Sequence, residues 1–195
     1  MRGTVHDLCT SEKTGGKKHR VDAVTLLRGH GIVGDGHAGT WHRQISLLAE
    51  EHIDEMRAKG LTLEPGAFGE NIVTEGIDLL ALEVGRRIRI GPGAVLQITQ
   101  HGKACHTRCP IYYEAGDCIM PKKGVFARVV RSGEVHPGDE LVTDAAFDRY
   151  RYAVITLSDR SAAGARKDEA GPLAVELLAQ AVEGTLVAQE VLSDT

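Results

Sequence analysis

The stretch GRRIRIGPGAVLQITQ, residues 85–100, gives the clearest indication of the fold. It holds two runs rich in β-branched residues, GRRIRIG and AVLQITQ, on either side of a Gly-Pro-Gly sequence at 91–93. β-Branched side chains favour extended backbone, and glycine with proline is typical of the turn between two strands. The stretch therefore predicts two consecutive β-strands.

Runs of the same kind recur on both sides of this stretch. Each is short, bounded by turn-forming residues, and either alternating, apolar or rich in β-branched residues: GTVHDLCTS (3–11), VDAVTLLRGHGIVGDG (21–36), GVFARVVRSG (124–133) and DELVTD (139–144). Many short strands separated by turn signals predict an all-β barrel. One segment differs, because SLLAEEHIDEMRAKG (46–60) spaces its apolar residues for a single amphipathic helix that closes at Gly60.

The pattern changes after about residue 145. An apolar strand over 152–157 is followed by a polar turn, by a helix around Leu173, Leu177 and Leu178, and by a second strand over 186–191. Strand, helix and strand in this order predict a βαβ unit, the start of a parallel sheet. We therefore expect a mainly β barrel domain over 1–145, then a truncated α/β domain over 150–195 whose strand edges are left open.

Composition is that of a globular protein, with 42% hydrophobic and 26% charged residues among 195 and a formal net charge of −4. The basic residues are scattered, so neither a nucleic acid nor a membrane surface is predicted as a partner. The N-terminus lacks the apolar run of a signal peptide, and no stretch approaches the roughly 18 apolar residues of a membrane span. The sequence therefore predicts a cytoplasmic protein whose thiols are kept reduced.

Two glycine-containing stretches carry polar side chains that suit a ligand. GHGIVGDGHAGTWHRQISLL (29–48) brings His37, His42 and Arg43 around a loop that suits an anion, although a barrel corner with surface histidines has the same composition. LEPGAFGENIVTEGIDL (63–79) places Glu70 and Asn71 just before an apolar strand, where they present a carboxylate and an amide or serve as turn residues.

The cysteines gather in HGKACHTRCPIYYEAGDC (101–118), which holds three of the four in the chain. The spacing of Cys105, Cys109 and Cys118 matches zinc-binding patterns poorly. Lys103, with the neighbouring His106 and Arg108, supplies the positive charge that lowers a thiol pKa, so the segment predicts a reactive cysteine. Cys9, in an apolar strand, is expected to be a small buried hydrophobe instead.

Taken together, GIVGDGHAGTWHRQISLL, PGAFGENIVTEGIDLLALEVGRRIRIG, AVLQITQHGKAC and GVFARVVRSGEVHPGDEL resemble the MOSC domain, named for the C-terminal domain of molybdenum-cofactor sulfurase. The resemblance covers about residues 3–143 and implies a β-barrel associated with the molybdenum cofactor, molybdopterin, or with sulfur carriage. A pyridoxal phosphate association is also implied at family level. In relatives a late cysteine ligates molybdenum, and some members reduce N-hydroxylated compounds.

Carried onto this chain, the resemblance places the working thiol, as catalytic group and metal ligand, at Cys105 or alternatively at Cys109. The other implied cofactor-binding residues come from the two glycine-containing stretches and from the segment before the cysteines: Gly34, Asp35, His37, Arg43, Glu70, Asn71 and Lys103. The extra cysteines and the absence of a proline before Cys105 depart from the commonest bacterial form.

The C-terminal stretch YAVITLSDRSAAGARKDEAGPLAVELL resembles the opening of the molybdopterin adenylyltransferase-like family. The matching positions are Ser158, Asp159, Arg160 and Asp168, but the glycine-rich loop for the pterin phosphate is absent, so adenylyl transfer is not predicted.

Three functions remain open. The first is a domain that handles the molybdenum cofactor in its biosynthesis or sulfuration, as a sulfur transferase for example, with a sulfur donor or a molybdoenzyme as its protein partner. The second is a molybdenum-dependent oxidoreductase acting on N-hydroxylated compounds, and the third is a structural zinc module without enzymatic activity. Fusion to an adenylyltransferase-like segment favours the first, because joined domains often serve one pathway.

Overall fold

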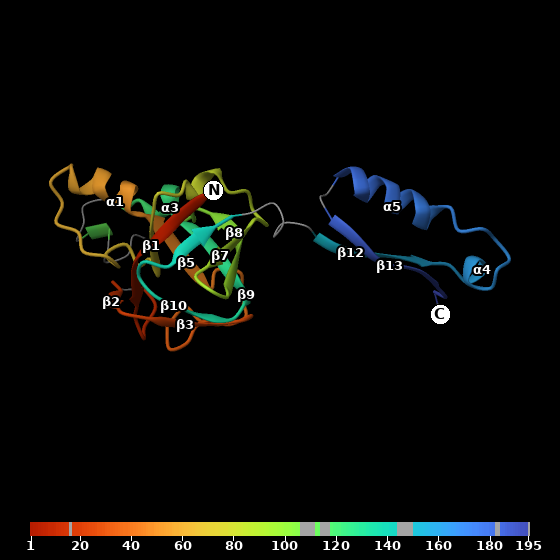
Figure 1. The fold of residues 1–195 in the computed structure, drawn as a ribbon, viewed down its shortest axis with the longest axis horizontal. Helices are drawn as coiled ribbons and strands as arrows, with labels where there is room; N and C mark the ends of the chain where they lie inside the picture. The colour runs from red at the N-terminus through yellow and green to blue at the C-terminus, as the bar shows by residue number, and fades with distance from the viewer. Residues whose placement is uncertain (16, 106–111, 114–117, 144–149, 182–183, 195) are drawn as a thin grey trace. The chain divides into compact units, whose positions relative to one another are not determined.

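The structure is a computed structural model, and it describes residues 1–15, 17–105, 112–113, 118–143, 150–181 and 184–194. The chain divides into two compact units, Met1–Asp144 and Ala145–Thr195, each of which is described by itself (Figure 1). None of the helices in the described residues has the length and apolar character needed to cross a bilayer.

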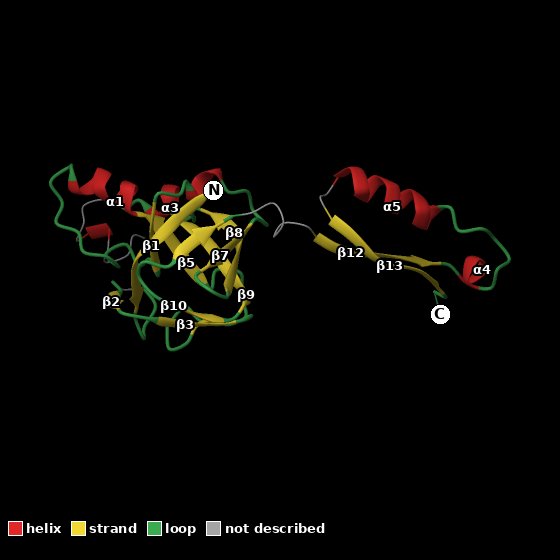
Figure 2. Ribbon diagram, viewed as in Figure 1, coloured by secondary structure: helices red, strands yellow, loops and turns green. Residues whose placement is uncertain are grey.

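The first unit is a β-barrel, as the sequence predicts (Figure 2). In hydrogen-bonding order, the strands of its ring are β11 (Glu140–Val142), β7 (Arg87–Ile90), β8 (Ala94–His101), β9 (Val125–Arg131), β5 (Ile45–Ala49), β6 (Ile72–Glu75) and β1 (Arg2–Thr10). Pairing of β1 with β11, from Arg2 opposite Val142 to Thr4 opposite Glu140, closes this ring within the described residues. Strand β2 (His19–Val21) extends the sheet beyond the ring by pairing with β1.

A single apolar core fills the barrel. Strand β7 turns Ile88 and Ile90 inward, and β8 does the same with Leu96 and Ile98, all of them at most 1% exposed. Each such side chain contributes roughly 1.5–3 kcal/mol by leaving water. The strong alternation of the opening stretch is therefore the alternation between core and surface, and the prediction of two strands there is confirmed.

A small second sheet lies against the barrel. It pairs β10 (Gly133–Val135) with β3 (Val24–Leu27), and β3 with β4 (Gly31–Ile32). Gly133 allows the approach, because a side chain there would place its Cβ 2.8 Å from the backbone nitrogen of Ala94 on β8. From β4 the chain enters the glycine-rich loop that leads to β5.

The predicted helix over 46–60 is correct only in its middle part, residues 50–57. Helix α1 spans Glu50–Arg57, whereas Ile45–Ala49 form strand β5. Strand β5 is buried along its whole length: Leu47 faces the barrel core and Leu48 faces a second apolar cluster under α1. A strand buried on both faces reads as a continuous apolar run, which periodicity does not distinguish from the start of a helix.

The first unit also contains two short helical turns. The 3₁₀ helix η1 (Leu79–Ala81) is capped by the Asp78 carboxylate, and α3 (Met120–Lys123) places Met120 in the second apolar cluster.

The second unit is the predicted strand, helix and strand. Strands β12 (Tyr150–Leu157) and β13 (Gly184–Leu192) pair in parallel, and α4 (Asp159–Ala162) and α5 (Ala170–Ala181) lie between them in sequence. Asp168 accepts a hydrogen bond from Thr156 on β12 (3.0 Å) and one from the Gly171 N–H of α5 (3.1 Å), and so ties the helix to the strand. The resemblance of this unit to the adenylyltransferase-like family stays a prediction.

Several large apolar side chains of the second unit are exposed to solvent. Those that are 45–64% exposed are Ile155, Leu157, Leu173, Leu177, Val187 and Leu192. Two strands, one short helix and one longer helix bury little of the apolar surface on which a fold of this kind depends for its stability.

We therefore predict that the second unit opens more readily than the barrel. Amides of residues 153–157 in β12 should exchange with solvent deuterium at least about tenfold faster than amides of residues 95–99 in β8, because fewer buried contacts oppose local opening. Hydrogen exchange read by mass spectrometry on the whole chain measures both segments in one sample. Equal protection of the two segments would contradict the prediction.

Candidate functional site

The glycine-rich loop between β4 and β5 turns at Gly34, whose φ of +84° is a left-handed conformation that favours glycine. The turn directs the next residue, Asp35, into the protein, where its side chain is fully buried. His37 follows at the rim with a side chain 30% exposed. One short loop thus places one polar group below the surface and another at it.

Asp35 forms a buried ion pair with Lys18, whose Nζ lies 2.5 Å from Oδ2. The carboxylate also accepts hydrogen bonds from the N–H groups of Ser11 (3.2 Å) and His37 (2.9 Å) and from the side-chain amide of Asn71 (3.1 Å). Burial by itself would raise the pKa of Asp35, but hydrogen bonds from His37 and Lys18 and the charge of Lys18 hold it below its usual value. Asp35 is therefore an ionised buried group with its acceptor positions filled by the protein.

Asn71 connects this pair to the barrel. Its side-chain nitrogen also donates to the carbonyl oxygen of Cys9 on β1 (3.2 Å), and its side-chain oxygen accepts from the Ser46 hydroxyl of β5 (2.9 Å). The amide is therefore held on both sides, and its position follows from the pairing of the strands.

Glu70 has a different environment from the adjacent Asn71. Its two carboxylate oxygens accept hydrogen bonds from the backbone N–H groups of Gly66 (2.6 Å) and Phe68 (3.0 Å), and the residue is 0% exposed. Burial raises the pKa of Glu70 to about 7, against the opposing effect of these donors. The carboxylate shapes the 66–69 turn and does not line the pocket described next.

A pocket of about 170 Å³ lies above this buried cluster. Its polar lining includes Ser46 and four residues that the sequence singles out, His37, Arg43, Asn71 and Lys103, and its apolar lining includes Phe68, Met120 and Phe126. The glycine loop, the 69–71 segment and the segment leading to the cysteines therefore meet at one place, although they lie far apart in sequence.

Arg43 is fixed in this pocket by aromatic rings. Its guanidinium carbon lies 4.9 Å from the ring centroid of Trp41 and 5.7 Å from that of Phe126, within the range of cation–π attraction. Its Nε is buried and has no hydrogen-bond partner among the residues the structure describes. A buried donor without an acceptor costs free energy, so this one suits an anionic ligand.

His37 stands between the buried ion pair and the pocket. Its Nδ1 lies 3.2 Å from the Lys18 ammonium group, and its ring stacks on Trp41 at 6.4 Å between centroids. The Trp41 indole N–H donates to the His37 carbonyl oxygen (2.8 Å). When Lys18 donates to Nδ1, the ring proton of a neutral His37 sits on Nε2, where it can serve as a hydrogen-bond donor.

The cysteines fall into different environments. Cys105 is exposed and lies two residues beyond Lys103, whereas Cys109 lies outside the described residues. Cys9 is buried, and burial raises the pKa of its thiol to about 12. Within the described ranges, no three His, Cys, Asp or Glu side chains are grouped closely enough to hold a metal ion. Of the two predicted working thiols, Cys105 is therefore the one that lies within the described residues.

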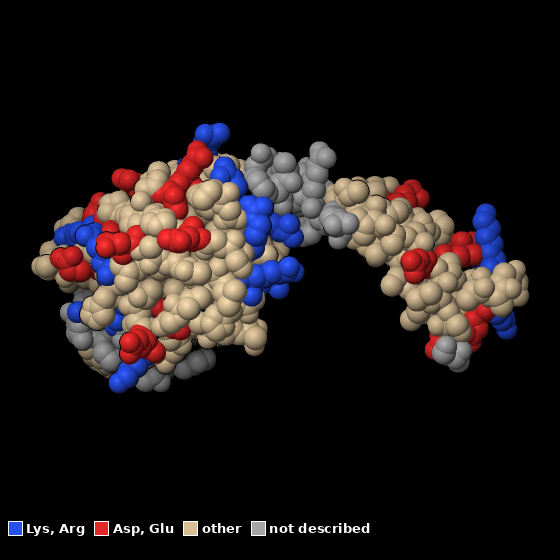
Figure 3. Space-filling model, turned by 60° about the horizontal axis from the view of Figure 1, so that its bottom comes forward, with Lys and Arg blue, Asp and Glu red and all other residues tan. Residues whose placement is uncertain are grey.

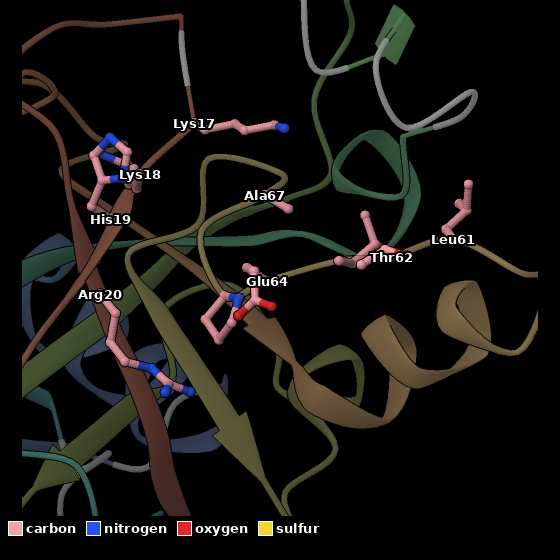
Figure 4. Close-up of a pocket in the computed structure, with 10 residues that line it drawn as sticks. Lys17, Lys18, His19, Arg20, Leu61, Thr62, Glu64 and Ala67 are labelled. Atoms are coloured by element: carbon pink, nitrogen blue, oxygen red, sulfur yellow. The ribbon is translucent and has the colours of Figure 1, made fainter.

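A second pocket, of about 470 Å³, lies on the other side of the 66–67 turn (Figure 4). Lys17, His19 and Arg20 line one side of it, and Glu64 with the apolar chain of 61–67 lines the other (Figure 4). Lys18 takes part in both the second pocket and the buried ion pair, because its backbone lines this pocket while its amine donates to Asp35.

The sequence does not single out three residues that form the pocket or the ion pair below it. Lys18 sits in the run KKHR, where nothing distinguishes it from its neighbours, and Ser46 lay within the predicted helix. Trp41 lies in the glycine-rich stretch 29–48. As the single tryptophan of the chain it could have been identified as a candidate for the site.

Comparison with known proteins supports the barrel assignment. Residues 34–142 match the MOSC domain, which is more than half of the chain, whereas no curated protein matches it. Among solved structures, the YuaD protein from Bacillus subtilis is 24% identical with a TM-score of 0.60, and the match covers 72% of this chain and 94% of that one. YiiM from Escherichia coli is 25% identical with a TM-score of 0.54, with 74% and 71% covered.

The 24% match is evidence of a shared fold alone, whereas the domain match extends over the pocket residues from His37 to Phe126 and over most of the barrel strands. The chain therefore belongs to the MOSC domain family.

Proposed function

We propose that the first unit binds the molybdenum cofactor through the phosphate-bearing end of its pterin and presents a cysteine thiol to it. The observation that carries this proposal is Arg43, a guanidinium held between Trp41 and Phe126 whose buried Nε has no acceptor in the described part of the chain. Lys103 lines the same pocket and adds a second cation. A phosphate accepts hydrogen bonds from a guanidinium in fixed geometry and is neutralised by the ammonium group.

The size of the pocket indicates how much of the cofactor it encloses. Pockets that surround drug-sized ligands measure about 300–1,000 Å³, and this one measures about 170 Å³. It is therefore large enough for a phosphate group with its attachment, and the planar ring system would lie outside. Trp41, which is 39% exposed at the rim, offers an aromatic surface on which such a ring can stack.

Cys105 is the thiol best placed for the proposed role among the described residues, since it is exposed and follows Lys103 closely in sequence. A thiolate at that position would serve as a metal ligand or carry sulfur as a persulfide. When bound, the cofactor supplies a molybdenum centre for sulfur or oxygen-atom chemistry. The protein's own part is to bind the anion, exclude water with its aromatic wall, and offer a hydrogen bond from His37 Nε2.

The buried Lys18–Asp35 pair keeps this arrangement rigid. It holds His37 from below through one backbone and one side-chain contact, and it holds Asn71 through the Asp35 carboxylate. Binding groups that are already in place lose less conformational entropy when the ligand arrives.

The first test of the proposed function concerns Arg43. The substitution Arg43→Gln should weaken binding of an oxidised phosphorylated pterin by at least about tenfold, because a charge-assisted pair to phosphate is lost. Quenching of Trp41 fluorescence reports binding directly, since the chain has a single tryptophan. The exposed Arg2→Gln serves as the charge-matched control.

The same titration with the dephosphorylated pterin separates the phosphate contact from ring stacking. Wild type should bind the dephosphorylated pterin about as weakly as Arg43→Gln binds the phosphorylated one. Equal affinity of wild type and Arg43→Gln for the phosphorylated pterin would overturn the proposal.

The second prediction concerns the ion pair. Asp35→Asn should lower the free energy of unfolding by about 3–5 kcal/mol, because it leaves the Lys18 ammonium buried without a countercharge. The exposed Glu12→Gln should change it by less than about 0.5 kcal/mol. Urea denaturation followed by circular dichroism measures both, and a loss below about 1 kcal/mol for Asp35→Asn would show that the pair is not the anchor described.

The third prediction concerns the thiols. Cys105 should react with iodoacetamide well before Cys9 at neutral pH, because Cys9 is buried and its pKa is raised to about 12. Peptide mass spectrometry after timed labelling distinguishes the two. The phosphorylated pterin should slow labelling of Cys105 and leave Cys9 unaffected, and a Cys105 rate that the pterin does not change would remove this thiol from the proposed site.

A further inference from the structure

Strand β2 lies outside the closed ring at the end of the large sheet. Among the strands that the structure describes, it pairs with β1 alone, and its middle residue, Arg20, lies opposite Cys9. One edge of β2 is therefore without a neighbouring strand. An edge of this kind presents main-chain hydrogen-bonding groups that another extended chain can use.

The hydrogen bonds of Cys9 show which way the main chain of Arg20 points. Cys9 donates its N–H to the carbonyl oxygen of Asn71 (2.8 Å), and its own carbonyl oxygen accepts from the Asn71 side chain (3.2 Å). Both main-chain groups of Cys9 are thus directed away from β2, which makes Cys9 and Arg20 a non-hydrogen-bonded pair of the antiparallel ladder. The N–H and C=O groups of Arg20 therefore point to the outer side of β2.

The outer edge is closed two residues before Arg20. The N–H of Lys18, which alternation directs to the same side, donates to the carbonyl oxygen of Gly66 (2.9 Å). Gly66 permits this approach, because a Cβ there would lie 2.3 Å from the carbonyl oxygen of Lys18. Within the described residues, the main chain of Arg20 has no corresponding hydrogen bond to another segment. The edge is therefore open beside Arg20.

The open part of the edge faces the second pocket, of about 470 Å³ (Figure 4). Arg20 lines one side of this pocket, and residues 61–67 line the other, where Leu61, Leu63, Pro65 and Ala67 supply an apolar wall. Pockets of about 300–1,000 Å³ hold drug-sized ligands. The space therefore suits a few residues of an extended chain, which rises about 3.3 Å per residue.

Charge contributes little to what this pocket selects. The Arg20 guanidinium is already bonded to the buried Asp7 carboxylate, at 2.5 Å from Nε and 2.9 Å from the second nitrogen. Lys17 has an interaction partner of its own, and Glu64 adds an acidic group to the same lining. Figure 3 also shows acidic and basic side chains together on one face of the first unit. The open main-chain groups are therefore the more specific feature of the pocket.

We propose that the outer edge of β2 binds an extended peptide segment of a partner protein by strand addition, with an apolar side chain of the peptide against residues 61–67. The peptide residue opposite Arg20 accepts a hydrogen bond from the Arg20 N–H and donates its own N–H to the Arg20 carbonyl oxygen, as in a hydrogen-bonded antiparallel pair. In this mode of recognition the main chain gives affinity and the side-chain pocket gives specificity.

A single extended chain fits this edge better than a second copy of the protein. Residues 61–67 bound the pocket on the side opposite β2, so the space accepts a thin chain, whereas the edge of a folded sheet would collide with that wall. The inference goes beyond the proposed function. It rests on β1, β2 and the 61–67 segment, and it holds whether or not the first pocket binds a pterin.

The test measures binding of a fluorophore-labelled peptide, Ser-Val-Leu-Val-Ser with blocked ends, to the whole chain by fluorescence anisotropy. Arg20→Pro removes the outward N–H, which β1 does not use, and edge strands tolerate proline. Arg20→Gln is the matched control, because it removes the same guanidinium and keeps the N–H. Arg20→Pro should bind the peptide at least about tenfold more weakly than Arg20→Gln, since a peptide carbonyl loses its donor.

Two altered peptides test the interaction on wild type, without any change to the protein. N-methylation of the three central residues keeps the side chains and removes the donors, so affinity should fall at least about tenfold. Serine in place of the three apolar residues keeps the main chain and removes the contact with the wall, so affinity should fall at least about fivefold.

Hydrogen exchange followed by NMR locates the contact on the protein. In the free chain the Arg20 amide should exchange faster than the amides of His19 and Val21, which point toward β1. Saturating peptide should slow exchange at Arg20 by at least about tenfold. Circular dichroism of both variants confirms that the barrel is retained.

The proposal is overturned if the parent peptide does not bind at millimolar concentration, if N-methylation leaves its affinity unchanged, or if bound peptide does not slow exchange at Arg20. Equal affinity of folded Arg20→Pro and Arg20→Gln would overturn it as well. A dimer in analytical ultracentrifugation that Arg20→Pro abolishes and Arg20→Gln retains would assign the edge to a second copy instead.

Discussion

The fold depends on the pairing of β1 with β11. Residues 2–4 pair with residues 140–142, so the ring closes only when the two ends of the first unit meet. Once it is closed, each ring strand has a neighbour on both sides, which removes the open edges that would invite pairing with other chains. The free energy cost of joining such distant segments is offset by the core that the closed ring encloses, from Val5 to Leu141.

Closure also determines where the polar groups meet. Cys9 on β1, Ser46 on β5 and Asn71 beside β6 lie on strands that are neighbours in the ring, and their hydrogen bonds join there. The buried Asp35 and Lys18 complete this network from the loop and from the segment before β2. A satisfied polar network in a low-dielectric interior is rigid, whereas losing one member leaves the others costly to bury. The residues that form the base of the pocket are therefore held in fixed positions.

Much of the barrel could be predicted because strands such as β7 have one solvent-exposed face and one face in the core. In β7 the alternation of Arg87 and Ile88 reflects water on one side and core on the other, and the sequence shows that period directly. Strand β5 has no solvent-exposed face, so the sequence pattern at Leu47 and Leu48 is the same as that of a first turn of the following helix. The closing β1–β11 pair cannot be seen in a local pattern at all, because its partners are separated by almost the whole unit.

The site was predictable in part for a similar reason. His37 and Arg43 stand out because a loop with several glycines surrounds them, and Asn71 because it precedes a strand. Lys18 does not stand out, since its importance comes from Asp35, 17 positions away, and from burial that only the tertiary structure creates. Glu70 shows a different case: the local pattern leaves open a carboxylate presented to a ligand or a turn residue, and two backbone donors hold the carboxylate within the 66–69 turn.

Strand β5 has one more consequence. Its side chains alternate between two separate apolar cores, and the same strand carries Ser46 of the pocket, with Arg43 two residues before its start. A change of side-chain volume at Ile45 or Leu47 would therefore shift the backbone that positions Ser46 and Arg43 in the pocket, because close-packed cores transmit strain. Residues of this strand are thus constrained both by packing and by the shape of the pocket, so substitutions that alter the pocket at the least cost to folding are expected in the loops that carry Trp41 and Lys103.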